Sequence, residues 1–235
     1  MLIVVDKSLN YGRTLIRRYL KDADYSTVLD IGAGAGTDLL PAREFNQNVE
    51  LNAIECHDHY LNILRSIDID AHKIDIEKDR LPFPDRSMDV VIVNQVIEHT
   101  KEIFWIFHEI SRVLADSGTL IVGMPNLASL HNRLLLLFGI QPTQIKAGSA
   151  HVRGYTKNDF LKFLEAGFPG GYRLCHFGGC NFYPFPPFVA KPLARMFPSM
   201  AWGILFKLEK RKRYANGFLE YPASQSFETN FYLGE

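Results

Sequence analysis

The sequence predicts a doubly wound α/β fold with a mostly parallel sheet. Two observations predict it. Short apolar strands alternate with amphipathic helices along the first half of the chain, and these strands are apolar at nearly every position. Strands of this kind are covered on both faces, as they are in parallel sheets. Strand–helix–strand units in succession make right-handed crossovers, so they build one continuous sheet.

The predicted strands are runs of β-branched and aliphatic residues that end at glycine, asparagine or acidic residues. Four of them are strong, at 27–31, 51–55, 88–94 and 118–124, and 72–75 is weaker. A further run at 201–208 is expected to close the sheet.

Helices are predicted where apolar residues recur every three or four positions. This spacing occurs at 15–20, 57–66 and 103–114, and the leucine-rich stretch 127–138 is expected to form a helix over the sheet edge. Thr156 is a candidate N-cap for another helix, with Asp159 three residues further on. Residues 141–154 are expected to be a loop, and 178–198 are too rich in glycine, proline and phenylalanine for a clear prediction. We therefore expect one domain over 1–208 and a polar tail over 209–235, packed on the domain or extending from it.

Composition excludes several classes of protein. The chain has 26 basic and 26 acidic residues and a pI near 7.1, which argues against a dedicated nucleic-acid binder. Its three cysteines are too few and too scattered for a disulfide framework. No run approaches the roughly 18 apolar residues of a spanning helix. These features predict a reduced, globular, cytoplasmic protein without a transmembrane segment.

A glycine-rich loop follows the first predicted strand. Residues 30–37 read Asp-Ile-Gly-Ala-Gly-Ala-Gly-Thr, and a helix is expected after them. Such loops let a ligand approach the backbone closely beside a helix N-terminus. The dinucleotide fingerprint G-x-G-x-x-G needs a third glycine where Thr37 stands. The register therefore argues against an NAD-dependent oxidoreductase, which stays as a lesser alternative.

Glu55 ends the second predicted strand, beside the glycine loop in the expected sheet. A carboxylate at this place binds the hydroxyls of a ribose in many α/β proteins. The alternative interpretation of Glu55 is a solvated strand end. The glycine loop next to it favours the ribose.

Residues 28–126 resemble the class I S-adenosylmethionine-dependent methyltransferases, in their small-molecule and sugar branch. The resemblance lies in VLDIGAGAG at 28–36, LPFPDRSMDVV at 81–91 and RVLADSGT at 112–119, where Ala115, Asp116 and Thr119 depart from the family pattern. It implies a Rossmann-like, seven-stranded methyltransferase fold with S-adenosylmethionine as cofactor. It also implies a donor site that comprises Asp30, Gly32, Ala33, Gly34, Glu55, Cys56, Asp75, Ile76 and Asn94, with Asp79 as a second candidate for the place of Asp75.

Two further motifs resemble parts of the family that bear on the methyl acceptor. Glu98-His99 is similar to a pair in sugar and quinone O-methyltransferases, and residues 151–156, HVRGYT, are similar to an element of sugar-modifying enzymes. They make His99 and His151 candidate catalytic bases, and Arg153 and Tyr155 candidate substrate-binding residues. The alternatives are an ordinary helix start and a loop held by a salt bridge. Gln95 stands where the quinone group has a metal-binding glutamate, so no metal is expected.

The sequence thus predicts an O-methyltransferase for a small molecule, a sugar or a polysaccharide precursor. A non-catalytic module that binds S-adenosylmethionine is the main alternative. Tyr11-Gly12-Arg13 is a candidate lid over the donor, or else an exposed helix start. Aromatic residues at 182–188, followed by basic residues at 207–213, suggest contact with a membrane surface, although a core-covering loop and a solvated charged stretch explain them as well.

Overall fold

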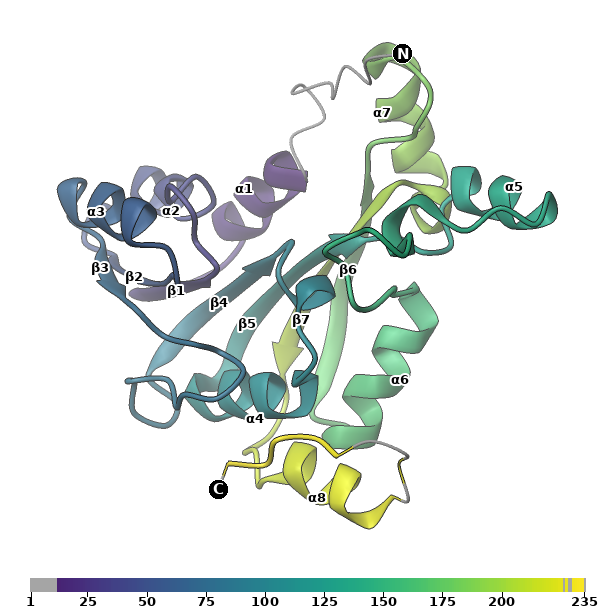
Figure 1. Ribbon diagram of the computed structural model, residues 1–235. Helices are drawn as coiled ribbons and strands as arrows, with labels where there is room; N and C mark the ends of the chain where they lie inside the picture. The colour runs from purple at the N-terminus through teal and green to yellow at the C-terminus, as the bar shows by residue number, and fades with distance from the viewer. Residues whose placement is uncertain (1–11, 226, 228–229, 235) are drawn as a thin grey trace.

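One sheet of seven strands forms the centre of the protein (Figure 1). The computed structural model describes residues 12–225, 227 and 230–234. The strands are β1 (Thr27–Ile31), β2 (Glu50–Ile54), β3 (Asp70–His72), β4 (Met88–Asn94), β5 (Leu114–Pro125), β6 (Tyr172–Cys180) and β7 (Gly203–Lys210). Their order is β3-β2-β1-β4-β5-β7-β6, and only β7 runs antiparallel to its neighbours. The predicted doubly wound, mostly parallel sheet is confirmed.

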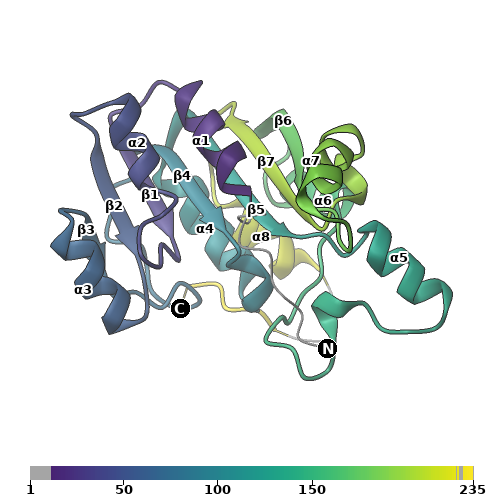
Figure 2. The same cartoon turned by 90° about the horizontal axis from the view of Figure 1, so that it is seen from above.

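Helices cover both faces of this sheet (Figures 1 and 2). One face carries α1 (Arg13–Lys21), α2 (Leu40–Phe45) and α3 (Asp58–Ser66), and the other carries α4 (Ile103–Val113), α6 (Lys157–Gly167) and α8 (Gly217–Ser224). Successive strand residues point to opposite faces. In β4, Val90 and Ile92 therefore pack under the first group of helices, while Val91 and Val93 pack under the second. This two-sided burial explains why apolar residues stand on both faces of the central strands.

The predicted boundaries agree best in the middle of the sheet. β1 and β4 have the predicted bounds, whereas the weak strand expected at 72–75 lies earlier, as β3. β6 was not predicted, because its residues alternate between partly buried and exposed positions and it pairs only with β7, far along the chain. Thr156 caps α6 as expected, and its hydroxyl accepts the N–H of Asp159 at 3.3 Å.

Two helices stand beyond the sheet, next to β5, β6 and β7 (Figures 1 and 2). They are α5 (Leu130–Leu137) and α7 (Pro187–Met196), and both contribute to a small separate core around Phe182, Ala190, Ala194 and Ala201. The sequence placed the first of these helices over the sheet edge. Instead it points away from the sheet, and Leu134, Leu136 and Leu137 are exposed.

The chain beyond residue 208 continues the domain. β7 extends to Lys210, and the fully buried Phe218 of α8 packs against Phe107 of α4. Tyr232 then contacts Trp105, also on α4. The segment expected to be a polar tail therefore covers the outer side of α4. Among the described residues, no helix is long and apolar enough to cross a membrane.

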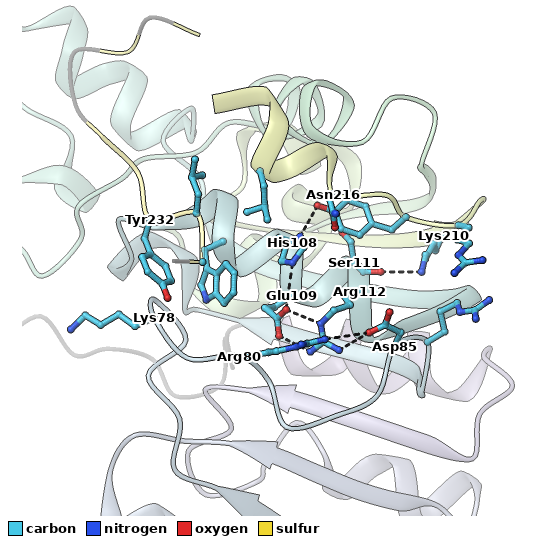
Figure 3. A pocket seen from close by; sticks show the side chains of 17 residues that line it. Lys78, Arg80, Asp85, His108, Glu109, Ser111, Arg112, Lys210, Asn216 and Tyr232 are labelled. Carbon is cyan, nitrogen blue, oxygen red and sulfur yellow. Dashed lines mark hydrogen bonds and ion pairs between the residues drawn. The ribbon is translucent and has the colours of Figure 1, made fainter. Parts of the chain in front are cut away.

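Arg112 of α4 fixes the loop that leads into β4, beside a surface cavity of about 520 Å³ (Figure 3). Its guanidinium donates to both carboxylate oxygens of Glu109, at 2.7 and 2.6 Å, and to Asp85 at 2.9 Å. It also donates to the carbonyls of Leu81 and Phe83, at 3.0 and 2.8 Å. The arginine that the sequence placed in a family motif is thus a structural brace.

Candidate functional site

The glycine loop lies at the carboxyl end of β1. Gly32 and Ala33 donate their N–H groups to the carbonyl of Ile54 at 2.8 and 3.2 Å, which holds the loop against the end of β2. Gly32 and Gly34 have φ angles of +74° and +53°. A Cβ on Gly32 would lie 2.5 Å from Val96, whereas the place of a Cβ on Gly34 has no atom within 4 Å. A ligand can therefore approach the backbone at Gly34.

Glu55 ties this loop to the next strand. One carboxylate oxygen accepts the N–H of Gly34 at 2.9 Å, and the other accepts those of Cys56 and His57, both at 2.9 Å. The Cys56 thiol also lies 3.6 Å from the oxygen that binds Cys56 and His57, so the oxygen that binds Gly34 is the one with an acceptor site left for a ligand hydroxyl. The sequence predicts that Glu55 binds both hydroxyls of a ribose. This arrangement leaves room for one hydroxyl while the carboxylate also holds the loop.

Two adjoining cavities open on the loop, with volumes of about 720 and 590 Å³. Gly32, Glu55, Gln95 and His99 line both of them. We call the larger one the apolar cavity, after its isoleucine and valine walls, and the smaller one the acidic cavity, after its carboxylates. Their shared wall makes them one cleft at the carboxyl ends of β1, β2 and β4, where open α/β sheets bind ligands.

The apolar cavity suits a flat ring next to a ribose. Its walls come from Ile54, Ile74, Ile76 and Val96. Cys56, Asp75 and Ile76, which the sequence assigned to the donor site, line it together with Asp79. Asp79 accepts the backbone N–H of Asp75 at 2.8 Å and so shapes the turn at this wall.

The acidic cavity contains the groups that would face the methionine end of the donor. Asn94 donates to Asp38 at 2.9 Å, and Arg13 lies 3.3 Å from the other oxygen of that carboxylate. All three line the cavity together with Ala33 and Gly34. Arg13 belongs to the motif that the sequence interpreted as a lid, while Tyr11 lies outside the described residues.

Asp30 lies beneath the loop and is almost completely buried. Burial, together with the negative charges of Asp38 and Glu55, raises the pKa of Asp30 well above its usual range. The structure therefore places Asp30 under the cleft and not in its lining.

These features fit S-adenosylmethionine, the donor that the sequence resemblance implies. The open space at Gly34 admits the ligand, and the remaining acceptor site of Glu55 suits a ribose hydroxyl. When bound, the donor supplies a methyl group on a positively charged sulfonium. Asp38 and Glu55 give the acidic cavity a negative charge that favours this cation. Arg13, which pairs with Asp38, lines the same cavity.

Two histidines from distant segments meet at the acidic cavity. His99 follows β4, and His151 comes from the loop between α5 and α6; their ring centroids are 4.6 Å apart. Nδ1 of His151 lies 2.8 Å from the carbonyl oxygen of Gln144, and Nδ1 of His99 lies 3.3 Å from that of Ala150. Burial and the neighbouring His99 lower the pKa of His151. The two residues predicted as candidate bases are thus neighbours.

Glu98 completes this group, and its environment differs from that of Glu55. It is 1% exposed, neither carboxylate oxygen has a hydrogen-bond partner, and burial raises its pKa to about 7. One of its oxygens lies 3.9 Å from Nε2 of His99. Ligand-capable atoms of Glu98, His99 and His151 all lie within 4.8 Å of one another, a donor set that a divalent cation can use. The expectation that no metal binds stays a prediction.

Arg153 and Tyr155, the candidate substrate-binding residues, have other partners. Arg153 donates to the carbonyl of Lys101 at 2.9 Å and lies over the ring of Phe231. Tyr155 is buried, and its hydroxyl donates to the carbonyl of Ile97 at 3.3 Å. Neither residue lines the cleft. Both fasten the loop of His151 to the domain.

Sequence reasoning missed several residues of the cleft. Asp38, Val96 and Thr100 line it, and Gln144 orients His151. Their residue types carry no distinctive signal, and only the folded chain brings them to the site. Position after β4 was the one available signal for Val96 and Thr100, because loops at that end of the sheet carry ligand contacts.

The chain has the Rossmann-like fold of the methyltransferases, and comparison with known proteins matches part of it to a methyltransferase family. Residues 29–122 match the family described as Methyltransferase domain. An uncharacterised protein of Methanocaldococcus jannaschii is 32% identical over 116 residues, which are 49% of this chain and 48% of that protein. The chain therefore spans about half the length of this curated relative.

Solved structures with the same fold include enzymes of more than one activity. A methyltransferase of Thermotoga maritima is 16% identical with a TM-score of 0.61, and the match covers 87% of this chain and 91% of that one. One of Mesorhizobium loti is 15% identical with a TM-score of 0.59, covering 86% and 100%. The 4+2 cyclase SpnF is 19% identical with a TM-score of 0.57, covering 84% and 79%. At these identities the likeness shows the fold.

Residues 29–122 therefore resemble a methyltransferase domain, and solved structures with this fold include S-adenosylmethionine-dependent methyltransferases. The acceptor has to be argued from the residues around His99 and His151.

Proposed function

We propose that the protein transfers a methyl group from S-adenosylmethionine to a hydroxyl group of a small molecule, a sugar or a polysaccharide precursor. The observation that carries this proposal is the hydrogen bond from His151 to the carbonyl of Gln144, at the rim of the acidic cavity. It gives a neutral imidazole a fixed orientation beside the place that the methionine end of the donor would occupy.

The bond to Gln144 determines which nitrogen of His151 can act as a base. A carbonyl oxygen only accepts, so the proton of the neutral ring lies on Nδ1, and Nε2 keeps its lone pair. The lowered pKa keeps the ring neutral near pH 7. Nε2 can therefore remove the proton of an acceptor hydroxyl while the oxygen bonds to the methyl carbon and the carbon–sulfur bond breaks. Such a base contributes about 10²–10⁴-fold in rate.

His99 is the second candidate base, and its Nε2 lies 3.9 Å from the buried carboxylate of Glu98. Its Nδ1 has a longer contact, 3.3 Å to the carbonyl oxygen of Ala150, than the 2.8 Å bond that orients His151. We therefore assign the base role to His151 and expect His99 to orient the acceptor. A comparison of the two single variants tests this division of roles.

Donor binding and methyl transfer should be measured separately. Calorimetry with S-adenosylmethionine and S-adenosylhomocysteine tests the cleft, and transfer of a labelled methyl group to a panel of sugars and phenols tests the acceptor. His151→Gln should lower kcat by about 100-fold or more and leave donor affinity unchanged. His99→Gln should have the smaller effect on kcat. The exposed His59, which does not line the cleft, supplies the control variant His59→Gln.

The other outcomes decide between the alternatives. Donor binding without transfer to any acceptor favours a non-catalytic binding module. Binding of NAD in place of S-adenosylmethionine, with a change in absorbance on reduction, favours the oxidoreductase. Activity that a chelator abolishes and a divalent cation restores would replace the histidine base by a metal-dependent mechanism.

A further inference from the structure

The exposed apolar side chains are concentrated in one part of the molecule. Fourteen large apolar residues are exposed in the described part of the chain, and nine of them lie in 134–140 and 185–197. The three most exposed are Phe188, Leu137 and Phe138, at 79%, 76% and 74%. We call α5, α7 and their flanking residues, 130–140 and 182–202, the apolar arm. Figures 1 and 2 show α5 standing away from the sheet, while α7 packs beside β6.

The same part of the chain has no negative charge. The chain contains 26 acidic residues, yet 117–158 and 166–208 contain none. The arm itself carries Arg133, Lys191 and Arg195, all exposed, and the exposed Lys146 follows α5. Exposed leucine and phenylalanine between cations, without acids, match anionic headgroups above acyl chains. Contact with the arm of a second copy would place these cations against one another, which is unfavourable.

Packing and hydrogen bonds attach the arm to the domain, so its exposed face does not result from a loosely attached helix. Its separate core joins Phe182 to the alanines of α7. The side chain of Asn126 donates to the carbonyls of Ser199 and Ala201 at 3.0 and 2.8 Å. The His131 ring contacts Tyr183 and Trp202, at centroid distances of 4.7 and 5.4 Å. Tyrosine and tryptophan suit the interface between headgroups and acyl chains.

A continuous set of hydrogen bonds joins the arm to the candidate base. The buried Asn132 of α5 bonds to the side chain of Gln144, and the carbonyl of Gln144 accepts from His151 at 2.8 Å. His131 also lies 3.1 Å from the hydroxyl of Thr143. The loop that carries His151 is therefore built on the base of the arm. A surface that binds the arm lies next to the entrance for the acceptor.

We infer that the apolar arm docks on an anionic lipid bilayer, and that the acceptor is a hydroxyl carried by an amphipathic molecule in that bilayer. The second part rests on the function proposed above. Leu137, Phe138 and Phe188 enter the interface, while Arg133, Lys191 and Arg195 contact lipid phosphates. The acceptor reaches the acidic cavity from the headgroup layer, without leaving the membrane.

Flotation of the full chain with vesicles tests the docking in the absence of donor and acceptor. The chain should float with equimolar phosphatidylglycerol and phosphatidylcholine, and far less with phosphatidylcholine alone. Raising the salt to about 0.5 M should reduce binding, because it screens the headgroup charge. The variant Leu137→Glu/Phe188→Glu should bind at least about tenfold more weakly, and Lys191→Gln or Arg195→Gln about fivefold more weakly each.

Matched changes outside the arm are the controls. Leu40→Glu alters an exposed leucine of α2, and Lys162→Gln alters an exposed lysine of α6. Both should float like the unmodified chain. The inference is overturned if the chain ignores anionic vesicles, or if the arm variants bind as well as the controls. It is also overturned if the arm variants dissociate a dimer without any change in flotation, which would assign the arm to a second copy.

A separate measurement tests the second part of the inference, that the acceptor lies in the bilayer. Transfer to a hydroxylated lipid in anionic vesicles should exceed transfer to its water-soluble headgroup, and the arm variants should abolish this difference. Vesicle binding without methyl transfer to any acceptor would contradict the proposed function and leave the docking intact. Transfer to soluble acceptors without vesicle binding would contradict the docking alone.

Discussion

Glu55 and Glu98 are two buried carboxylates in the wall of one cavity, and they differ in their hydrogen bonding. Glu55 accepts three backbone N–H groups and braces the glycine loop. Glu98 accepts none, and burial raises its pKa to about 7. The donor side of the cleft is therefore organised before any ligand arrives. The acceptor side keeps an unsatisfied polar group, which costs stability.

The contrast extends to the surroundings of each side. The donor side is built from β1, β2 and β4, whose residues are covered on both faces. The acceptor side depends on one histidine after β4 and another on a loop whose base is an exposed arm. Unsatisfied polar groups in a folded protein tend to mark function. Stability and specificity are therefore separated in the cleft: the donor side stabilises the fold, and the acceptor side would select the substrate.

Removing the Arg112 brace, which lies outside the cleft, should have the largest effect on stability. Arg112→Met deletes the guanidinium that neutralises Glu109 and holds the carbonyls of Leu81 and Phe83. It leaves Glu109 buried without its partner, so the free energy of unfolding should fall by about 3–5 kcal/mol in urea titrations. Arg211→Met, which removes an exposed ion pair with Glu209, should change it by less than about 1 kcal/mol. Equal losses in the two variants would contradict the comparison.

Removing the buried, unpartnered carboxylate of Glu98 on the acceptor side should raise the stability of the protein. The ordinary pKa of a glutamate is near 4.5 and that of folded Glu98 is about 7, so between these values the folded state binds more protons. Stability therefore falls as the pH rises from about 4.5 to about 7. Glu98→Gln removes this cost and should be about 3 kcal/mol more stable than the unmodified chain at pH 8. The two proteins should be equally stable at pH 4.

This pH dependence is read from unfolding curves at pH 4, 6 and 8. Glu102→Gln, at a partly buried acid that forms an ion pair with Lys101, is the control. A stability difference between Glu98→Gln and the unmodified chain that does not change with pH would show that Glu98 is not the titrating group.

Glu55→Ala should weaken donor binding by about 1–3 kcal/mol, because charged hydrogen bonds to a ribose hydroxyl and to the Gly34 N–H are lost. Calorimetry with S-adenosylhomocysteine measures it. Glu50→Ala, at the exposed start of the same strand, is the matched control. Unchanged affinity in Glu55→Ala would remove this residue from the donor site.

The donor side was the part that the sequence could predict. β1 and β4 are mostly apolar runs, and the glycine loop and Glu55 follow strands directly, so their local sequence is sufficient. β6 escaped prediction, because an edge strand with glycines at 178 and 179 gains its stability from β7 and not from its own residues. Local sequence does not show such pairing.

The acceptor side could be predicted only as a set of residue types. His99 and His151 were identified, but their contact depends on the path of the loop between α5 and α6. Arg153 and Tyr155 are polar, as substrate-binding residues are, but their side chains donate to backbone carbonyls and hold the loop of His151 in place. The unpartnered state of Glu98 is a property of the packing around it, which no spacing in the sequence reports.

The smallest effect we predict concerns how firmly the acceptor side is anchored. The hydroxyl of Thr156 caps α6 directly after the loop of His151, through a bond to the N–H of Asp159. Thr156→Ala should lower the free energy of unfolding by about 1 kcal/mol, the usual cost of losing an N-cap. Asn158→Ala, at an exposed position of the same first turn, should have a smaller effect. If the loop depends on this cap, Thr156→Ala should also lower kcat while donor affinity stays the same. Loss of donor affinity would mean that the two sides of the cleft are coupled, and the separation of stability from specificity would fail.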